Sequence, residues 1–337
     1  MGFWKYKQFT KLGALAVVCY VLCCMTQMRE PCCGGGASKH DANLSITQNS
    51  VPDVIGLGIR KCGTGVFVKF LEKHGSFAIP KYINYETEYF TRNYVKGLDW
   101  YKSLFKDVAS DKVKVEKTPH YYYTEPYDMA ERMLKLNPNL KVFLILCEPA
   151  ARAYSCFVHH NFDLFGKYEW PEFFERYVNN TLPNLQEWLQ EYTYQQQETL
   201  VMERWWGRSE CLIAGLYALH LKRWKAKFDD SKLLILNGDE IMRNPGPSYE
   251  KFQDFVGVER RLRQEDWVKN NETGHFCLRP PADRSQIYCL DDGIAKARTR
   301  SLLAANTPTI ESLAALKAFY EPYNHMLYGI LGENYGW

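Results

Sequence analysis

The sequence predicts an α/β fold in which a central parallel sheet is flanked by helices. Short apolar runs bounded by turn residues occupy residues 53–59, 141–146 and 232–236. Each run is associated with a segment of helical periodicity, and strands that alternate with helices favour a parallel sheet with helices on both faces. The 337 residues, of which 46% are hydrophobic and 24% charged, can bury the core of one main domain.

The N-terminal region predicts a membrane anchor. Residues 12–28 carry no charged side chain and follow three lysines in residues 1–11, which is typical of a signal anchor behind a cytosolic tail. Residues 29–51 are rich in glycine, serine and asparagine and predict a flexible stem, so that residues 52–337 form the folded body. A cleaved signal peptide is the alternative. Both interpretations place the body in the lumen of the secretory pathway.

The turn after the first predicted strand has the composition of a phosphate-binding loop. The N-terminus of a helix offers N–H groups and the positive end of the helix dipole, and glycine lets the backbone close around an anion. Gly58 and Gly63 have the spacing of a Walker loop, but Lys61 lies inside the loop and not after it, which disfavours a nucleotide kinase. Taken alone, the loop could also be an ordinary strand-to-helix turn. The candidate phosphate-binding residues are Arg60, Lys61, Cys62, Gly63, Thr64 and Gly65.

Further motifs follow the loop in a fixed order. They are ETEYF at 86–90, GLDWY at 97–101, VEKTPHYY at 115–122, EPAARAYS at 148–155, GLYALHLKRW at 215–224, LLILNGDEI at 233–241, and the cysteine-bearing HFCL at 275–278 and YCL at 288–290. This series resembles the glycosaminoglycan sulfotransferases that use 3′-phosphoadenosine 5′-phosphosulfate (PAPS). It is most similar to the heparan sulfate glucosamine 3-O-sulfotransferases and to the N-sulfotransferase half of the N-deacetylase/N-sulfotransferases. The resemblance extends from about Pro52 to the C-terminus and implies the P-loop-like sulfotransferase fold.

The resemblance implies three catalytic residues. Sulfuryl transfer requires that the partners are positioned, that the charge developing on the departing phosphate is neutralised, and that a proton is removed from the acceptor. Lys61 and Lys117 match the two lysines of the family, and Glu86 matches its general base. The aromatic neighbours of Glu86 predict burial, which raises the pKa of a carboxyl group toward neutrality. Glu88 is a rival for the role of base and would lie on the same face if the segment were extended.

The remaining donor contacts are also implied by the family. Ser155 matches the serine that binds the 3′-phosphate, whereas Cys147 replaces the arginine of the 3-O-sulfotransferases, and a thiol cannot supply a bidentate cationic contact. The N-sulfotransferases also lack this arginine. Arg152, one helical turn before Ser155, matches a family arginine. Lys296 and Arg298 match a basic loop near the second cysteine of the C-terminal pair if a two-residue insertion is allowed.

Glu88, His159 and Arg223 are candidate contacts to the acceptor. A histidine occurs where His159 falls in the N-sulfotransferases, and Arg223 belongs to a basic run suited to a polyanionic glycan. A solvated helix face is the alternative for that run. His159 and His160 lack a cysteine or acid at metal-ligand spacing, so no metal site is predicted, and we expect the donor to bind without a metal.

Other features agree with a secreted or lumenal body. Cys277 and Cys289 lie in a loop-rich stretch and predict a disulfide. Asn43, Asn179 and Asn271 each begin an Asn-x-Ser/Thr triplet, which predicts glycosylation. The net charge of +3 predicts no nucleic-acid partner.

The sequence therefore predicts a single-pass type II Golgi membrane protein that transfers sulfo groups from PAPS to a glycosaminoglycan. The 3-OH of glucosamine in heparan sulfate is the leading acceptor, because the chain is too short to carry an additional deacetylase domain. A chondroitin- or dermatan-type N-acetylgalactosamine 6-O-sulfotransferase is the nearest enzymatic alternative. A catalytically weak relative that binds anionic glycans is another, and a P-loop kinase is a third.

Overall fold

The computed structural model describes residues 50–337 except 83–84, 125, 162–168, 206–208 and 291–306. Within these residues, no helix is both long and apolar enough to cross a bilayer. The predicted tail and anchor, almost all of the predicted stem, and the candidate residues Asn43, Lys296 and Arg298 lie outside the described residues.

A five-stranded parallel sheet forms the centre of the folded body, as predicted. Its strand order is β2-β3-β1-β4-β5, and every neighbouring pair is parallel. The middle strands are almost entirely buried, which explains why they are continuous apolar runs and not alternating patterns. The strands are β1 (Val54–Gly58), β2 (Phe77–Ala78), β3 (Val113–Lys117), β4 (Lys141–Leu146) and β5 (Leu233–Asn237).

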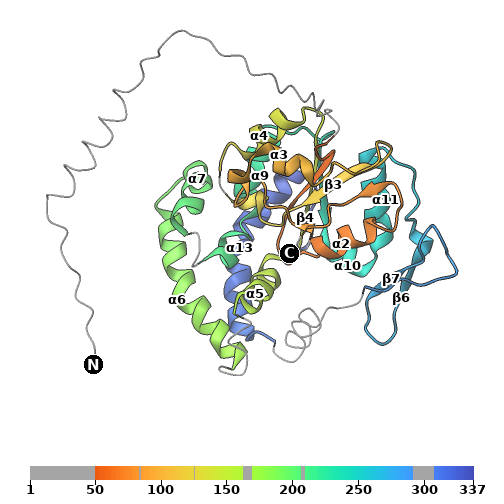
Figure 1. Cartoon of the computed structure of the whole chain (residues 1–337). Coiled ribbons are helices and arrows are strands. Elements are labelled where there is room, and N and C mark those ends of the chain that lie inside the picture. Colours follow the sequence, from red (N-terminus) through yellow and green to blue (C-terminus); the bar gives the residue numbers. More distant parts are fainter. Residues whose placement is uncertain (1–49, 83–84, 125, 162–168, 206–208, 291–306) are drawn as a thin grey trace, which may run out of the picture. The chain divides into compact units, whose positions relative to one another are not determined.

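Helices lie on both sides of this sheet. Figure 1 shows α2 and α11 on one side and α9 and α13 on the other. The longer helices are α2 (Thr64–Leu71), α3 (Gly97–Ser103), α4 (Met129–Leu136), α5 (Pro149–His160), α6 (Trp170–Gln190), α7 (Tyr194–Trp205), α9 (Tyr217–Lys225), α11 (Pro245–Val256) and α13 (Ile310–Leu331). Shorter helical elements are η2 (Tyr94–Lys96), η3 (Tyr121–Tyr123), α8 (Glu210–Ile213), α10 (Gly238–Arg243) and η5 (Gln264–Asp266).

Aromatic side chains pack the helices onto the two faces of the sheet. On the face of α2 and α11, the Phe67 ring stacks on Tyr249 with centroids 4.3 Å apart, and Phe143 of β4 meets Phe252 at 5.2 Å. On the other face, the indole Nε1 of Trp224 donates to the carbonyl of Tyr122 at 2.9 Å. These buried contacts hold the turns at the carboxyl ends of the strands in place.

A small antiparallel hairpin follows the sheet in the chain. It is made of β6 (Trp267–Lys269) and β7 (Phe276–Leu278). The predicted disulfide between Cys277 and Cys289 is present and joins β7 to the segment after it. Trp267 packs edge-on against Phe70 of α2 with ring centroids 4.9 Å apart, which attaches the hairpin to the helix that begins at the predicted phosphate loop.

Candidate active site

The predicted phosphate loop joins β1 to α2, as expected. Gly63 adopts a left-handed conformation (φ 82°) immediately before the helix, and Lys61 also has a positive φ of 78°. At Gly58, any Cβ would come within 2.7 Å of the Pro119 carbonyl oxygen, so the turn requires glycine there. In this described segment no side chain caps the start of α2 and no acid lies in its first turn. The helix start can therefore receive an anion.

Glu86 and Lys117 come together beside this loop. Lys117 is the last residue of β3 and is opposite Gly56 of β1. It therefore lies at the carboxyl ends of the parallel strands, where the loop begins. Its Nζ donates to Glu86 Oε1 at 2.5 Å. The Lys117 side chain is 2% exposed, whereas Glu86 is 25% exposed. The two predicted catalytic residues thus form one ion pair with its carboxylate toward solvent.

A buried carboxylate that sequence analysis missed lies behind this pair. Glu116 is fully buried and accepts hydrogen bonds from Thr87 Oγ1 at 2.7 Å, from Thr118 Oγ1 at 2.9 Å and from the Tyr101 hydroxyl. Burial raises the pKa of Glu116, and these hydrogen bonds oppose the shift. Because Thr87 follows Glu86 directly, Glu116 fixes the position of the candidate base. The strand is VKVEK, with charged side chains at three of its five positions, so no local apolar pattern indicated that Glu116 is buried.

Glu88 and Glu86 have different partners. The segment is a turn and not an extended strand, because Tyr85 and Glu88 both have positive φ angles, of 64° and 48°. The Glu88 carboxylate instead pairs with Arg92 Nε at 3.1 Å, four residues further along the chain. The condition for a shared face, an extended segment, is therefore not met.

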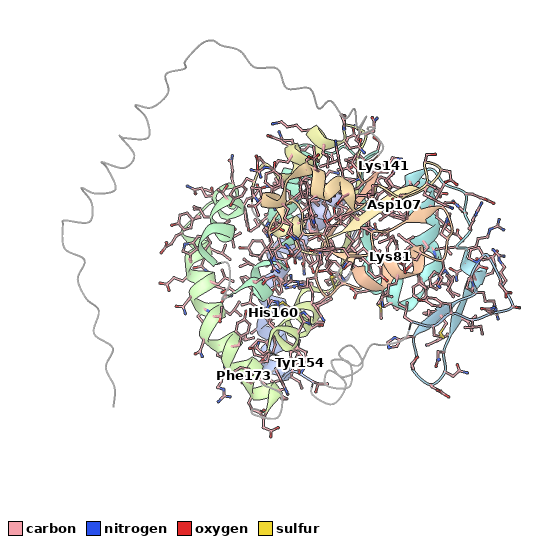
Figure 2. The ribbon with its side chains drawn as sticks, viewed as in Figure 1. Lys81, Asp107, Lys141, Tyr154, His160 and Phe173 are labelled. Atoms are coloured by element: carbon pink, nitrogen blue, oxygen red, sulfur yellow. A yellow bond between two sulfur atoms is a disulfide. The ribbon has the colours of Figure 1, made fainter. Side chains whose placement is uncertain are left out.

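The Arg60 side chain connects the loop to three other elements. Its Nη1 lies 3.0 Å from His160 Nε2, at the end of α5 (Figure 2), and 3.1 Å from Glu210 Oε1 on α8. Its Nη2 lies 3.3 Å from His120 Nδ1. Burial, together with the charges of Arg60, Arg92 and Lys117, lowers the pKa of His120 to about 3, so this imidazole is neutral. Arg60 thus anchors the loop.

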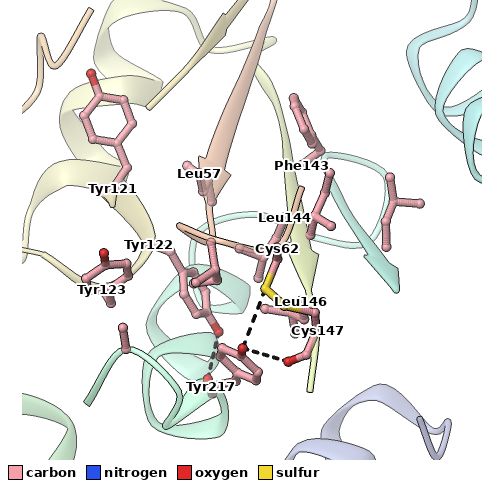
Figure 3. Packing of buried hydrophobic residues seen from close by; sticks show 14 of the residues in the cluster. Leu57, Cys62, Tyr121, Tyr122, Tyr123, Phe143, Leu144, Leu146, Cys147 and Tyr217 are labelled. Atoms are coloured by element: carbon pink, nitrogen blue, oxygen red, sulfur yellow. Dashed lines mark hydrogen bonds between the residues drawn. A yellow bond between two sulfur atoms is a disulfide. The ribbon is translucent and has the colours of Figure 1, made fainter. Parts of the chain in front are cut away.

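Two disulfides were not predicted, and one of them includes a residue of the loop. Cys62 is bonded to Cys147 at the end of β4, so Cys147 is not a free thiol as sequence analysis assumed. Figure 3 shows the Tyr217 hydroxyl donating to the Cys147 carbonyl, at 2.8 Å, close to the Cys62 sulfur. The Cys62 N–H donates to the Ile59 carbonyl within the turn. The phosphate loop is thereby covalently attached to the neighbouring strand.

The second disulfide joins Cys156 on α5 to Cys211 on α8. The two sulfurs and His160 Nδ1 lie within 4.8 Å of one another, which is the geometry of three metal ligands. Sequence analysis overlooked that Cys156 and His160 are four residues apart on α5, and the third member, Cys211, lies 51 residues after His160. As a disulfide, the two sulfurs are not thiolates and do not supply metal ligands.

The other predicted residues of α5 differ in burial. Arg152 is 2% exposed, and one guanidinium nitrogen donates to the Cys211 carbonyl; its Nε and Nη1 have no hydrogen-bond partner among the described residues. Ser155 is half-buried in the next turn. His159 is exposed at the helix end, where partial desolvation and the charge of Lys61 lower its pKa to about 4. A neutral imidazole therefore lies near Lys61.

Arg223 makes contacts that hold the fold. Its Nη2 donates to the carbonyls of Tyr122 and Thr124, the latter at 3.3 Å. The guanidinium also borders a cavity of about 170 Å³ together with Tyr127 and Trp224. Asn179 and Asn271, two predicted glycosylation sites, are exposed.

Comparison with known proteins agrees with this arrangement. Residues 51–277 match the family model described as the sulfotransferase domain. Heparan sulfate glucosamine 3-O-sulfotransferase 3A1 from Mus musculus is 25% identical over 90% of this chain and 70% of its own length. Heparan sulfate glucosamine 3-O-sulfotransferase 5 from Mus musculus is 26% identical over 90% of this chain and 79% of its own length.

The same fold occurs in solved sulfotransferase structures. The sulfotransferase from Alicyclobacillus acidocaldarius aligns with a TM-score of 0.55 and 17% identity, and the alignment covers 84% of this chain and 96% of that one. The family model covers most of the folded body and includes both the loop and the Glu86–Lys117 pair. The chain therefore belongs to the sulfotransferase domain family and is a sulfotransferase.

Proposed function

We propose that the protein transfers a sulfo group from PAPS to a glycosaminoglycan, with the 3-OH of glucosamine in heparan sulfate as the acceptor. The observation that carries this proposal is the ion pair between Glu86 and Lys117 at the sheet edge where the phosphate loop begins. Such a pair supplies a proton acceptor and a cation beside a site for an anionic donor. The names of the relatives, which are heparan sulfate glucosamine 3-O-sulfotransferases, supply the acceptor class.

The loop fits the anionic part of the donor. The N–H groups at the start of α2 and the charge of Lys61 would hold the 5′-phosphosulfate, and the first turn of α2 carries no opposing acid. Ser155 would contact the 3′-phosphate. Arg152, in its present position, is an interior group bound to the Cys211 carbonyl, so any donor contact would require a different rotamer. Lys296 and Arg298, which lie outside the described residues, are proposed as further donor contacts.

The reaction is an in-line displacement at sulfur. The acceptor hydroxyl oxygen attacks the sulfur while the bond from sulfur to the 5′-phosphate oxygen breaks, and the hydroxyl proton passes to a Glu86 carboxylate oxygen. Lys61 and the N–H groups of α2 neutralise the charge that develops on the departing phosphate. Lys117 faces the sulfo oxygens. Glu88, held by Arg92, and His159, near Lys61, would border the acceptor.

We also propose a Golgi location with an N-terminal type II anchor and glycans at Asn43, Asn179 and Asn271. Three disulfides among the described residues support an oxidising compartment. The exposed positions of Asn179 and Asn271 leave both available for modification.

Transfer of radiolabelled sulfate from PAPS to heparan sulfate, chondroitin and desulfated heparin tests the proposal. We expect transfer to heparan sulfate at the 3-position of glucosamine, and we expect Lys61→Ala to lower the rate at least ~10²-fold. We also expect adenosine 3′,5′-bisphosphate to raise the melting temperature in the presence of a chelator. Labelling of chondroitin alone would refute the acceptor assignment, and the lack of any melting shift would refute the donor.

A further inference from the structure

A cysteine pair and a histidine come together where α5 meets α8. Cys156 and His160 are four residues apart on α5, and Cys211 belongs to α8. The two sulfurs and His160 Nδ1 all lie within 4.8 Å of one another, and Cys211 Sγ is 3.7 Å from Nδ1. None of the roles proposed above uses these three side chains.

Thiolate and imidazole groups are ligands that Zn²⁺ prefers. Zn²⁺ takes a tetrahedral set of ligands, with thiolate sulfur at about 2.3 Å and imidazole nitrogen at about 2.0–2.1 Å, and soft thiolates favour it over Mg²⁺ and Ca²⁺. In the oxidised chain the two sulfurs are joined and do not act as thiolate ligands. The reduced chain offers two thiolates and one imidazole nitrogen, which fill three of the four positions.

The fourth position has access to solvent. Cys211, His160 and Glu210 line a cavity of about 540 Å³, which is large enough for water molecules. Cys156, by contrast, is 1% exposed. Zn²⁺ can therefore enter from the cavity, and a water molecule from the same side can complete the tetrahedron.

The second ring nitrogen of His160 already faces a carboxylate. Nε2 lies 3.9 Å from Glu210 Oε2. A histidine that binds a metal through one ring nitrogen almost always donates the other N–H to a carboxylate, a carbonyl or water, which fixes the orientation of the ring. Glu210 can take that role without being a metal ligand itself.

The tautomer of His160 connects this cluster to the phosphate loop. Arg60 Nη1 lies 3.0 Å from Nε2, and a guanidinium can only donate, so in the oxidised chain Nε2 accepts and Nδ1 carries the proton. When Nδ1 binds a metal, the ring proton is on Nε2. Nε2 then no longer accepts from Arg60 and donates to Glu210.

We propose that the reduced protein binds Zn²⁺ through Cys156 Sγ, Cys211 Sγ and His160 Nδ1, and that the bound metal removes one of the contacts by which Arg60 anchors the phosphate loop. A dithiol supplies the two electrons and two protons that convert the S–S bond into two thiols, and is itself oxidised to a disulfide. Zn²⁺ then displaces the two thiol protons. The metal site does not depend on the proposed function, whereas its effect on donor binding rests on it.

Titration of the reduced protein with Co²⁺ tests the site. The protein is reduced with a water-soluble phosphine in the absence of oxygen, and we expect the thiolate-to-cobalt charge-transfer band and the d–d bands of a tetrahedral site, which Zn²⁺ abolishes. His160→Gln, which keeps an acceptor for Arg60, should weaken metal binding at least about tenfold. His159→Gln and the double variant Cys277→Ser/Cys289→Ser are matched controls, and we expect them to bind Co²⁺ like the native protein.

Cys156→Ser covers the case in which full reduction unfolds the body, which circular dichroism detects. This variant leaves Cys211 as a thiol while the other two disulfides stay intact. We expect it to bind Co²⁺ through one thiolate, and at least about tenfold more weakly when His160→Gln is added. Absence of the charge-transfer band in both the reduced protein and Cys156→Ser, or equal binding with and without His160, would refute the site.

Binding of adenosine 3′,5′-bisphosphate tests the link to the loop. We expect Zn²⁺ to weaken nucleotide binding by about 2- to 10-fold in the reduced protein, because Arg60 loses a hydrogen bond, and to have no such effect in His160→Gln. An equal effect in both proteins would show that the metal acts on the nucleotide itself and would refute the link. If the metal binds but the nucleotide does not, the proposed function fails and the metal site stands.

Discussion

At the scale of single residues, burial and ion pairing distinguish four nearby titratable side chains. Glu86 is partly exposed and paired with Lys117, whereas Glu88 faces Arg92. Glu116 is enclosed and serves as a hydrogen-bond acceptor for hydroxyl groups. His120 is kept neutral by its surroundings. Only Glu86 combines access from solvent with a cationic partner at the sheet edge, which makes it the candidate base.

The support that Glu116 gives to this site can be measured. Replacement of Glu116 with Gln removes charge-assisted hydrogen bonds to Thr87 and Tyr101, and we expect a loss of about 1.5–3 kcal/mol in the free energy of unfolding. We also expect a lower kcat with an unchanged KM for the donor, since Thr87 adjoins Glu86. Urea denaturation and initial rates check both. Glu131→Gln, at an exposed pair with Lys227, should leave the free energy of unfolding and the kcat nearly unchanged.

At the scale of elements, the phosphate loop is attached to four other segments by side-chain contacts of Arg60 and by one disulfide. Arg60 reaches α5, α8 and the segment before η3, and Cys62 is bonded to the residue after β4. Preorganisation of this kind reduces the entropy lost when a ligand binds.

The disulfide of the loop should therefore affect both stability and donor binding. Cys62 and Cys147 are 85 residues apart, and loop-closure entropy predicts that replacing both with serine lowers the free energy of unfolding by about 4.6 kcal/mol. For Cys277 and Cys289, which are 12 residues apart, the predicted loss is about 2.8 kcal/mol. We expect weaker binding of adenosine 3′,5′-bisphosphate only in the first variant. Melting curves with and without the nucleotide measure both effects; equal nucleotide affinity in the two variants would contradict the role of the loop disulfide.

Local patterns were sufficient to predict the strands and the loop. Pairings between residues far apart in the chain could not be predicted from such patterns. The apolar runs of β1, β4 and β5, and the glycine at position 63, are signals contained in a few neighbouring residues. The pairing of Cys62 with Cys147 depends on β1 and β4 being neighbours in the sheet, which no short segment encodes. The turn around Glu88 was missed because its positive φ angles occur at Tyr85 and Glu88, without glycine or asparagine.

At the scale of the whole molecule, buried histidines make folding sensitive to acid. His220 is fully buried on α9, and burial followed by the charge of Arg223 lowers its pKa from 6.5 to about 3. Between pH 6.5 and about pH 3, His220 is therefore protonated in the unfolded chain but not in the folded protein. Stability is fully present above pH 6.5 and is lost as the pH falls toward 3.

We expect His220 to account for about 2 kcal/mol of the stability lost between pH 7 and pH 5, at about 1.4 kcal/mol per pH unit below 6.5. His220→Gln keeps a donor for the Ile213 carbonyl and should reduce the pH dependence by that amount. His325→Gln, at an exposed histidine of α13, should leave it unchanged. Urea denaturation at the two pH values provides the comparison, and identical slopes for all three proteins would contradict the assignment.

The rate of sulfate transfer from PAPS by Glu86→Gln, compared with Glu88→Gln, is the most direct test of the proposed chemistry. The two substitutions remove the same charge two positions apart, and the two glutamates have different partners. With native melting temperature and native binding of adenosine 3′,5′-bisphosphate as controls, we expect Glu86→Gln to lose at least ~10²-fold in kcat and Glu88→Gln to lose far less. Near-native transfer by Glu86→Gln, or an equal loss in both variants, would show that Glu86 is not the base.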